Sequence, residues 1–232
     1  MIIKAFLCLI PLHIFRSLYN NTIIQLPANV FSGLRYLQTL DLNGNKIVKL
    51  PQKIFYNLTA LKWLSLFNNT ITQLPANVFS GLRYLQTLYL HANNISQLPE
   101  TVFSDLTNLK NLSLFNNTIT QIPANVFSGL NYLQTLYLGT NKICELPETI
   151  FSNLSKLKLL DLGGNKIVRL PQKIFCDLTA LKYLVLHGNE LQTIPDGAFW
   201  NLTRLEYILL SDNPISRIGT RILSISSTDL FL

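Results

Sequence analysis

Charged residues, cysteines and long apolar runs are all scarce in this chain of 232 residues. Charged side chains make up 13% of it, about half of the roughly 25% usual in globular proteins, while 48% of the residues are hydrophobic. This excess of apolar side chains excludes intrinsic disorder, because burying them offsets the entropy lost on folding. The longest apolar run, Ala5 to Leu12, is far shorter than the ~20 residues of a membrane-spanning helix, so we expect no transmembrane segment in this chain.

Clustered reactive groups are also missing from the sequence. The cysteines Cys8, Cys144 and Cys176 are too few for a disulfide scaffold and lack metal-ligand spacing, and we expect the last two to be packed thiols. The 19 Lys and Arg residues form no run, which argues against a dedicated nucleic-acid binder. There is no glycine-rich phosphate loop. We therefore expect no enzymatic activity, no metal, no cofactor and no nucleic-acid partner.

A period of 24 residues runs through most of the chain. Eight prolines lie 24 residues apart, from Pro27 to Pro195, and a phenylalanine follows each one four residues later. The repeating unit is L-P-x-x-x-F-x-x-L-x-x-L-x-x-L-x-L-x-x-N-x-I-x-x. Its asparagine column consists of Asn45, Asn69, Asn93, Asn117, Asn141, Asn165, Asn189 and Asn213. Such regularity indicates a stack of similar coils.

The chemistry of one unit predicts how the coils stack. The alternation of apolar and variable residues in L-x-x-L-x-L, as in Leu37 to Leu42, is typical of a half-buried strand. One unit cannot bury its apolar face alone, so neighbouring units share a core. The phenylalanines fill that core as an aromatic spine, and the asparagine amides satisfy backbone groups at the turn after each strand.

This unit resembles the leucine-rich repeat, in the 24-residue variety common in animal extracellular proteins. It is similar to the repeats of Slit-like ectodomains, Toll-like receptor ectodomains and the variable lymphocyte receptors of jawless fish. The resemblance implies an α/β repeat: a solenoid with a parallel β-ribbon on its concave face and an irregular or short helical convex side. It covers residues 18–218, as a half unit and eight 24-residue units.

The two ends are less regular. Residues 1–17 begin with a basic and then apolar stretch, which favours either a signal peptide or a degenerate first repeat; both interpretations stay open. Residues 219–232 form a degenerate C-terminal unit or tail. Related extracellular proteins have cysteine-rich caps. Their absence here favours either a fragment of a longer gene or ends covered by a partner.

Large aromatic side chains gather at the solvent-facing positions of the predicted ribbon, which are the residues 12, 14 and 16 after each proline. Such rings are typical interface anchors, so we predict a binding surface there. Its residues are Trp63, Phe67, Tyr89, His91, Phe115, Tyr137, Tyr183, His187 and Tyr207. His91 and His187 lie four coils apart, too far to act as a catalytic or metal-binding pair. Along one margin of this surface, Lys62, Lys110, Lys158 and Lys182 would attract acidic proteins or sulfated glycans.

Sequons for N-glycosylation are numerous. Asn57, Asn153 and Asn201 share one column of the expected convex side, where a glycan would fit. Further sequons begin at Asn68, Asn94 and Asn116, and Asn111 is a sequon within the concave array. We therefore predict a receptor-like recognition module, secreted or on a cell surface, that binds a protein on its concave face. The alternatives are a structural or adhesive spacer of a larger receptor and a cytosolic leucine-rich-repeat adaptor.

Overall fold

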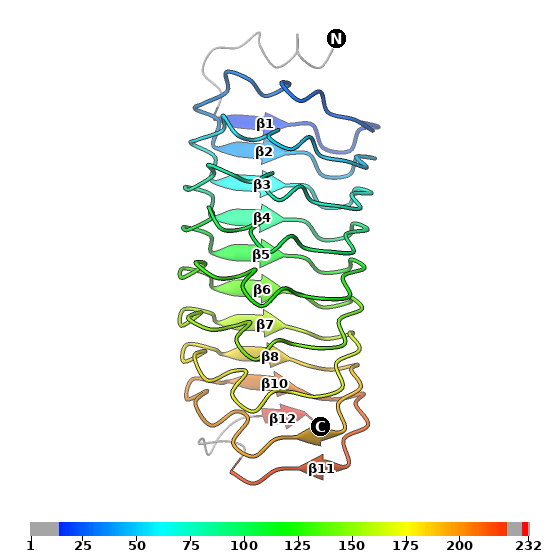
Figure 1. The fold of residues 1–232 in the computed structure, drawn as a ribbon, viewed down its shortest axis with the longest axis vertical. Helices are drawn as coiled ribbons and strands as arrows, with labels where there is room; N and C mark the ends of the chain where they lie inside the picture. Colours follow the sequence, from blue (N-terminus) through cyan, green and yellow to red (C-terminus); the bar gives the residue numbers. More distant parts are fainter. Residues whose placement is uncertain (1–13, 222–228, 232) are drawn as a thin grey trace.

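The computed structural model describes residues 14–221 and 229–231, which form a stack of similar coils (Figure 1). Most of the segment that the sequence identifies as a signal peptide or degenerate repeat, including Cys8, lies outside the described residues. Strand β1 (Phe15–Ser17) comes from the last residues of that segment.

Ten strands form one sheet, in the order β1-β2-β3-β4-β5-β6-β7-β8-β10-β12, and all their pairings are parallel. From β1 to β10, each residue pairs with the residue 24 positions later, as Leu40 does with Leu64. After β1, the strands are β2 Thr39–Asp41, β3 Trp63–Ser65, β4 Thr87–Tyr89, β5 Asn111–Ser113, β6 Thr135–Tyr137, β7 Leu159–Asp161, β8 Tyr183–Val185, β10 Tyr207–Leu209 and β12 Asp229–Phe231. Strands β9 (Thr193–Ile194) and β11 (Arg217–Ile218) form a separate parallel pair. The predicted parallel ribbon is confirmed.

The core is a continuous row of leucine and phenylalanine side chains. In β2 the middle residue Leu40 is fully buried while its neighbours are half-buried, and Leu42 just after the strand is also fully buried. Behind the strands, the phenylalanines stack in two runs, from Phe31 to Phe127 and from Phe151 to Phe199, with ring centroids 5.9 to 6.3 Å apart. The predicted aromatic spine is therefore present.

The asparagine column forms a hydrogen-bonded ladder between coils. The Asn117 amide donates to the carbonyl oxygen of Leu114 in its own coil and to that of Leu90 in the preceding coil, both at 3.0 Å. Its Oδ1 accepts the backbone N–H of Ile95, also at 3.0 Å. The other seven asparagines make the equivalent contacts, and all except Asn213 are buried.

The side opposite the ribbon is irregular rather than helical, and no residue of 14–221 lies in a helix. Each unit returns through turns with i to i+3 bonds, such as Val30 N–H to the Pro27 oxygen and Leu34 N–H to the Phe31 oxygen. Gly33, with a φ of 87°, interrupts this series in a conformation that a right-handed helix excludes. The sequence left open whether the convex side is irregular or contains short helices, and the structure shows that it is irregular.

Cys144 and Cys176 are both free and exposed, so the prediction of packed thiols is wrong. For Cys176, the other residues of its column explain the error. Ser32, Ser80 and Ser104 occupy the position of Cys176 in other units, which shows that this column faces water.

Candidate functional site

The solvent side of the strands, together with the residue two positions beyond each strand, is called the ribbon face below. All nine predicted binding residues lie on it, either half-buried or exposed. Phe115 and Tyr183 are the most exposed of the predicted aromatic residues, at 39% and 41%. Eight of the nine residues fall into three groups along the stack, and Phe115 lies beside the first group.

The first group is an aromatic cluster formed by Trp63, Phe67, Tyr89 and His91. The Trp63 ring meets the edge of Tyr89 with 5.9 Å between centroids, and Tyr89 meets His91 edge to face at 5.7 Å. His91 in turn stacks on Phe67 at 4.4 Å. Four rings from two adjacent coils are therefore in continuous contact, and Phe115 lies one coil further along.

Small residues beneath the rings make this cluster fit. Ser65, the register partner of Tyr89, is fully buried although it points toward the ribbon face. The larger side chains around it must therefore cover it. Its Oγ and the Nδ1 of His91 are buried without a hydrogen-bond partner. Burial also lowers the pKa of His91, because a desolvated imidazole resists protonation.

The second group brings Asp161 between Tyr137 and His187. Asp161 is the register partner of Tyr137, and its Oδ1 accepts the Gly163 N–H at 2.9 Å. Burial raises the pKa of the Asp161 carboxyl, although that hydrogen bond and the nearby His187 both lower it. Burial, and secondly the charge of Asp161, raises the pKa of the Tyr137 phenol.

Two glycines create the space for this group. A Cβ added at Gly139 would lie 2.8 Å from Asp161 Oδ1, and one added at Gly163 would collide with the His187 ring. Sequence reasoning placed His187 only with the distant His91 and so missed Asp161. The sequence did carry a signal for this contact. Gly139 and Gly163 occupy the column in which other units carry the large rings of Phe67, His91 and Phe115, so space is left there for neighbouring side chains. Among the described residues, no three His, Cys, Asp or Glu side chains come together as a metal site.

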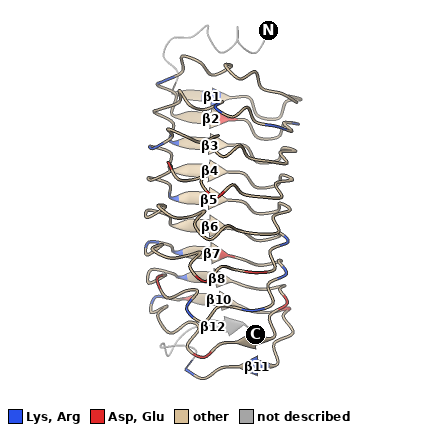
Figure 2. Ribbon diagram, viewed as in Figure 1, with Lys and Arg blue, Asp and Glu red and all other residues tan. Residues whose placement is uncertain are grey.

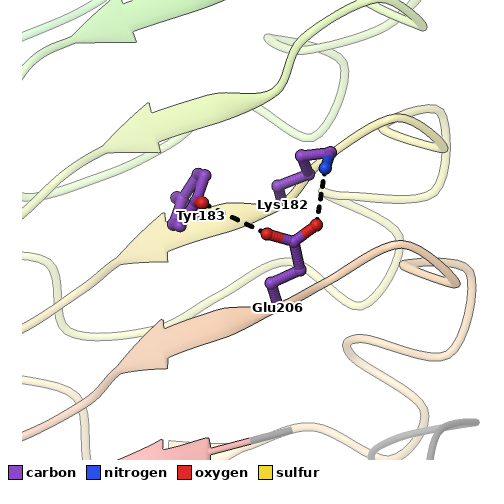
Figure 3. A network of polar contacts seen from close by, with 3 residues as sticks. All are labelled: Lys182, Tyr183 and Glu206. Atoms are coloured by element: carbon purple, nitrogen blue, oxygen red, sulfur yellow. Dashed lines mark hydrogen bonds and ion pairs between the residues drawn. The ribbon is translucent and has the colours of Figure 1, made fainter.

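The third group is a polar network at the start of β8 and β10 (Figure 3). The Tyr183 hydroxyl donates to Glu206 Oε2 at 3.1 Å, and Lys182 forms an ion pair with Glu206 Oε1 at 2.5 Å. This pair raises the pKa of Lys182 and lowers that of Glu206. Tyr207 is the register partner of Tyr183. One lysine of the predicted stripe is therefore already paired within the protein.

The remaining lysines of the stripe lie just before strands, on what is called the leading edge below. This edge consists of the four residues before each strand from β2 to β8 and before β10, namely 35–38, 59–62, 83–86, 107–110, 131–134, 155–158, 179–182 and 203–206. Its coils are joined by backbone bonds such as Lys110 N–H to the Gln86 oxygen and Lys158 N–H to the Gln134 oxygen, both at 2.8 Å. Figure 2 shows basic segments recurring where the chain runs into the strands.

The sequons fall on different sides of the coil. Asn57, Asn153 and Asn201 are exposed in the turns of the return segment, and Asn68, Asn94 and Asn116 are exposed after the strands. Asn111 differs because it lies within β5. Its amide donates to Thr87 Oγ1 at 3.2 Å, and its Oδ1 accepts from Thr135 Oγ1 at 2.8 Å.

Comparisons with known sequences find one family along most of the chain. The family model described as leucine rich repeat matches residues 35–95, 83–143, 132–191 and 155–215. Tsukushi from Rattus norvegicus and from Mus musculus is 38% identical over 65 residues, which is 24% of this chain and 18% of Tsukushi. The chain therefore spans less than a fifth of the curated relatives that it matches.

Solved structures share the architecture. A leucine-rich-repeat protein of Leptospira interrogans superposes with a TM-score of 0.66 at 33% identity, over 87% of this chain and 55% of that protein. TLR13 in a complex with ssRNA13 gives 0.74 at 30% identity, over 85% of this chain and 32% of TLR13. An internalin from Listeria monocytogenes shares the fold, with a TM-score of 0.70 at 22% identity. The superposition covers 93% of this chain and 65% of the internalin.

Proposed function

The chain belongs to the leucine-rich repeat family, and we propose that it is a non-enzymatic recognition module that binds a protein ligand on its ribbon face. The observation that carries this proposal is the aromatic cluster of Trp63, Phe67, Tyr89 and His91. Rings that already contact one another lose little rotational freedom when a partner covers them. They therefore bury apolar area at low entropic cost.

The position of the cluster supports the same function. It lies on a parallel ribbon of short strands whose inward-facing residues are fully buried. The core and the asparagine ladder therefore hold the backbone beneath the cluster in place. Binding energy at protein interfaces is concentrated in a few central aromatic residues. Phe115 extends the apolar surface by one coil, where its side chain is 39% exposed.

The test uses two tyrosines that differ in position. With a partner identified by screening a panel of displayed extracellular proteins, Tyr89→Ala should weaken binding by about 2 kcal/mol, roughly thirtyfold. Phe67→Ala should have a similar effect. Tyr56→Ala is the matched control, because Tyr56 is 54% exposed on a return turn, away from the ribbon face. Undiminished affinity of both ribbon-face variants would exclude this site and favour the structural spacer.

We also propose that the protein acts outside the cell or at its surface. The exposed sequons at Asn57, Asn153 and Asn201 support this context, since all three present their side chains on return turns. Expressed with its native N-terminus in animal cells, the protein should carry N-glycans. Its gel mobility should therefore change on peptide-N-glycosidase digestion. An unchanged mobility, with Met1 retained in cytosolic protein, would favour the cytosolic adaptor instead.

A further inference from the structure

The net charge of this protein is concentrated on one surface. Eight of the 19 Lys and Arg residues lie on the leading edge, together with one of the 12 Asp and Glu residues, so the edge alone has the chain's formal charge of +7. The remaining 11 basic and 11 acidic residues cancel. The basic residues of the edge are Arg35, Lys62, Arg83, Lys110, Lys156, Lys158, Lys182 and Arg204, and its one acid is Glu206.

These cations form a row rather than a cluster. Because the coils follow one another at about 4.8 Å, the row extends about 34 Å, with Lys62, Lys110 and Lys158 about 10 Å apart. Gln86 and Gln134 separate these lysines and accept from them: Lys110 Nζ donates to Gln86 Oε1 at 3.3 Å and Lys158 Nζ to Gln134 Oε1 at 3.4 Å. Neutral neighbours orient these lysines without cancelling their charge. Only Lys182 has an acidic partner on the edge.

Exposed tyrosines alternate with the lysines on the same edge. Tyr36 and Tyr84 are 68% and 64% exposed. Cations cover one face of two of these rings: the Arg35 guanidinium lies 4.9 Å from the Tyr36 centroid, and Lys156 Nζ lies 3.8 Å from that of Tyr132. Single-stranded nucleic acids bind chiefly by stacking bases on open aromatic faces. At Tyr36 and Tyr132, therefore, the structure favours a ligand that contacts the cations and the ring edges.

Near its C-terminal end, the edge opens into a hollow of about 900 Å³. Asn131, Tyr132, Ser155 and Lys156 line it from the edge, and the neighbouring return turns contribute Asp177 and the sequon residue Asn153. The hollow is thus lined by amide, hydroxyl and phenol groups beside one cation, a set suited to the hydroxyl groups of a sugar ring. Asp177 is engaged within the protein, because its Oδ2 accepts the Asn153 N–H at 3.0 Å.

We propose that the leading edge binds a linear sulfated polysaccharide that lies along the stack of coils. The evenly spaced lysines contact successive sulfate groups. The hollow around Tyr132 receives a sugar ring when the neighbouring Asn153 carries no glycan. A long polyanion also relieves the repulsion within a row of like charges, which no residue of the edge except Glu206 offsets. The leading edge borders the ribbon face and contacts it where Tyr183 donates to Glu206, but no residue of the aromatic cluster belongs to it.

The test compares two triple variants that remove the same charge. Lys62→Gln, Lys110→Gln and Lys158→Gln act on the edge, and glutamine already occupies that column at Gln38, Gln86 and Gln134, so the fold should be retained. The control triple Lys46→Gln, Lys142→Gln and Lys166→Gln changes exposed lysines after the strands. Binding of a heparin octasaccharide is measured by fluorescence titration at several salt concentrations.

The edge triple should weaken octasaccharide binding about tenfold and reduce its salt dependence, while the control triple should change affinity less than about twofold. Tyr132→Ala should also weaken binding. Desulfated heparin should not bind. Equal losses in the two triples would show unspecific attraction and overturn the proposal. Tighter binding of a single-stranded RNA of matched charge, lost in the same edge triple, would overturn it in favour of nucleic acid.

Discussion

Replacing Asn117 by alanine tests the ladder that joins the coils. Asn117 is 7% exposed and makes three close hydrogen bonds: two from its amide to Leu90 and Leu114, and one to its Oδ1 from the Ile95 N–H. The three groups that it contacts are affected unequally. The Leu90 oxygen also accepts from Asn93 and the Leu114 oxygen also accepts from Asn141, so both keep a partner. The Ile95 N–H loses its acceptor.

The expected magnitude follows from that inequality. A buried donor left without a partner costs about 1 to 3 kcal/mol, and the two amide bonds lost to doubly bonded carbonyls add less. We therefore expect Asn117→Ala to reduce the free energy of unfolding by about 2 to 3 kcal/mol. Asn213→Ala should cost less, because Asn213 is only half-buried and water can replace its contacts. Exposed Asn131→Ala should stay within about 0.5 kcal/mol.

Urea unfolding measures these values. The two tryptophans, Trp63 and Trp200, report on opposite halves of the stack, and circular dichroism reports on the whole. Coincident transitions would justify a single free energy of unfolding. If Asn117→Ala has the same midpoint as Asn131→Ala, the buried bonds do not stabilise the fold and the reasoning is refuted.

Three further outcomes follow from the ribbon face. Because burial raises the pKa of Asp161, the folded state loses stability as pH rises from below the ordinary value of 3.8. Asp161→Asn should therefore be more stable than the native protein at pH 7 and no more stable at pH 3. An equal difference in stability at both pH values, measured by urea melts, would contradict this. Burial lowers the pKa of His91, so native stability relative to His91→Phe should fall as pH drops below 6.5, and a pH-independent difference would refute it. In folded protein from animal cells, glycopeptide mapping should find glycan at Asn57 and none at Asn111, because a glycan would break both hydrogen bonds of the Asn111 side chain; an occupied Asn111 would show that β5 tolerates their loss.

Much of the fold was predictable because each unit solves the same packing problem. The two-residue alternation of a strand places Leu40 and Leu42 inward, and the 24-residue period places the same side of every unit against its neighbour. The Asn column was also predictable, since an amide is the side chain that both donates and accepts at a buried turn. The sequence did not distinguish irregular from helical return turns, because segments this short have only a weak tendency to form a helix.

Membership of a column proved more informative than residue type. Cysteine is usually buried, yet Cys176 is exposed because its column faces water in every unit, as the serines at equivalent positions indicate. The same reasoning from columns located the ribbon-face aromatics and the basic row. Both are properties of position within the unit, and they can be read along the sequence.

The sequence by itself therefore determined the coil, its core and the surface on which each column lies. Only the tertiary structure decided which side chains of neighbouring coils meet. Asp161 approaches His187 because Gly163 leaves space for the imidazole, and Lys182 pairs with Glu206 across adjacent coils. Those partners are 24 or 26 residues apart in sequence but one coil apart in space. The direction in which a long side chain leans depends on the size and charge of its neighbours, and stacking alone makes those residues neighbours.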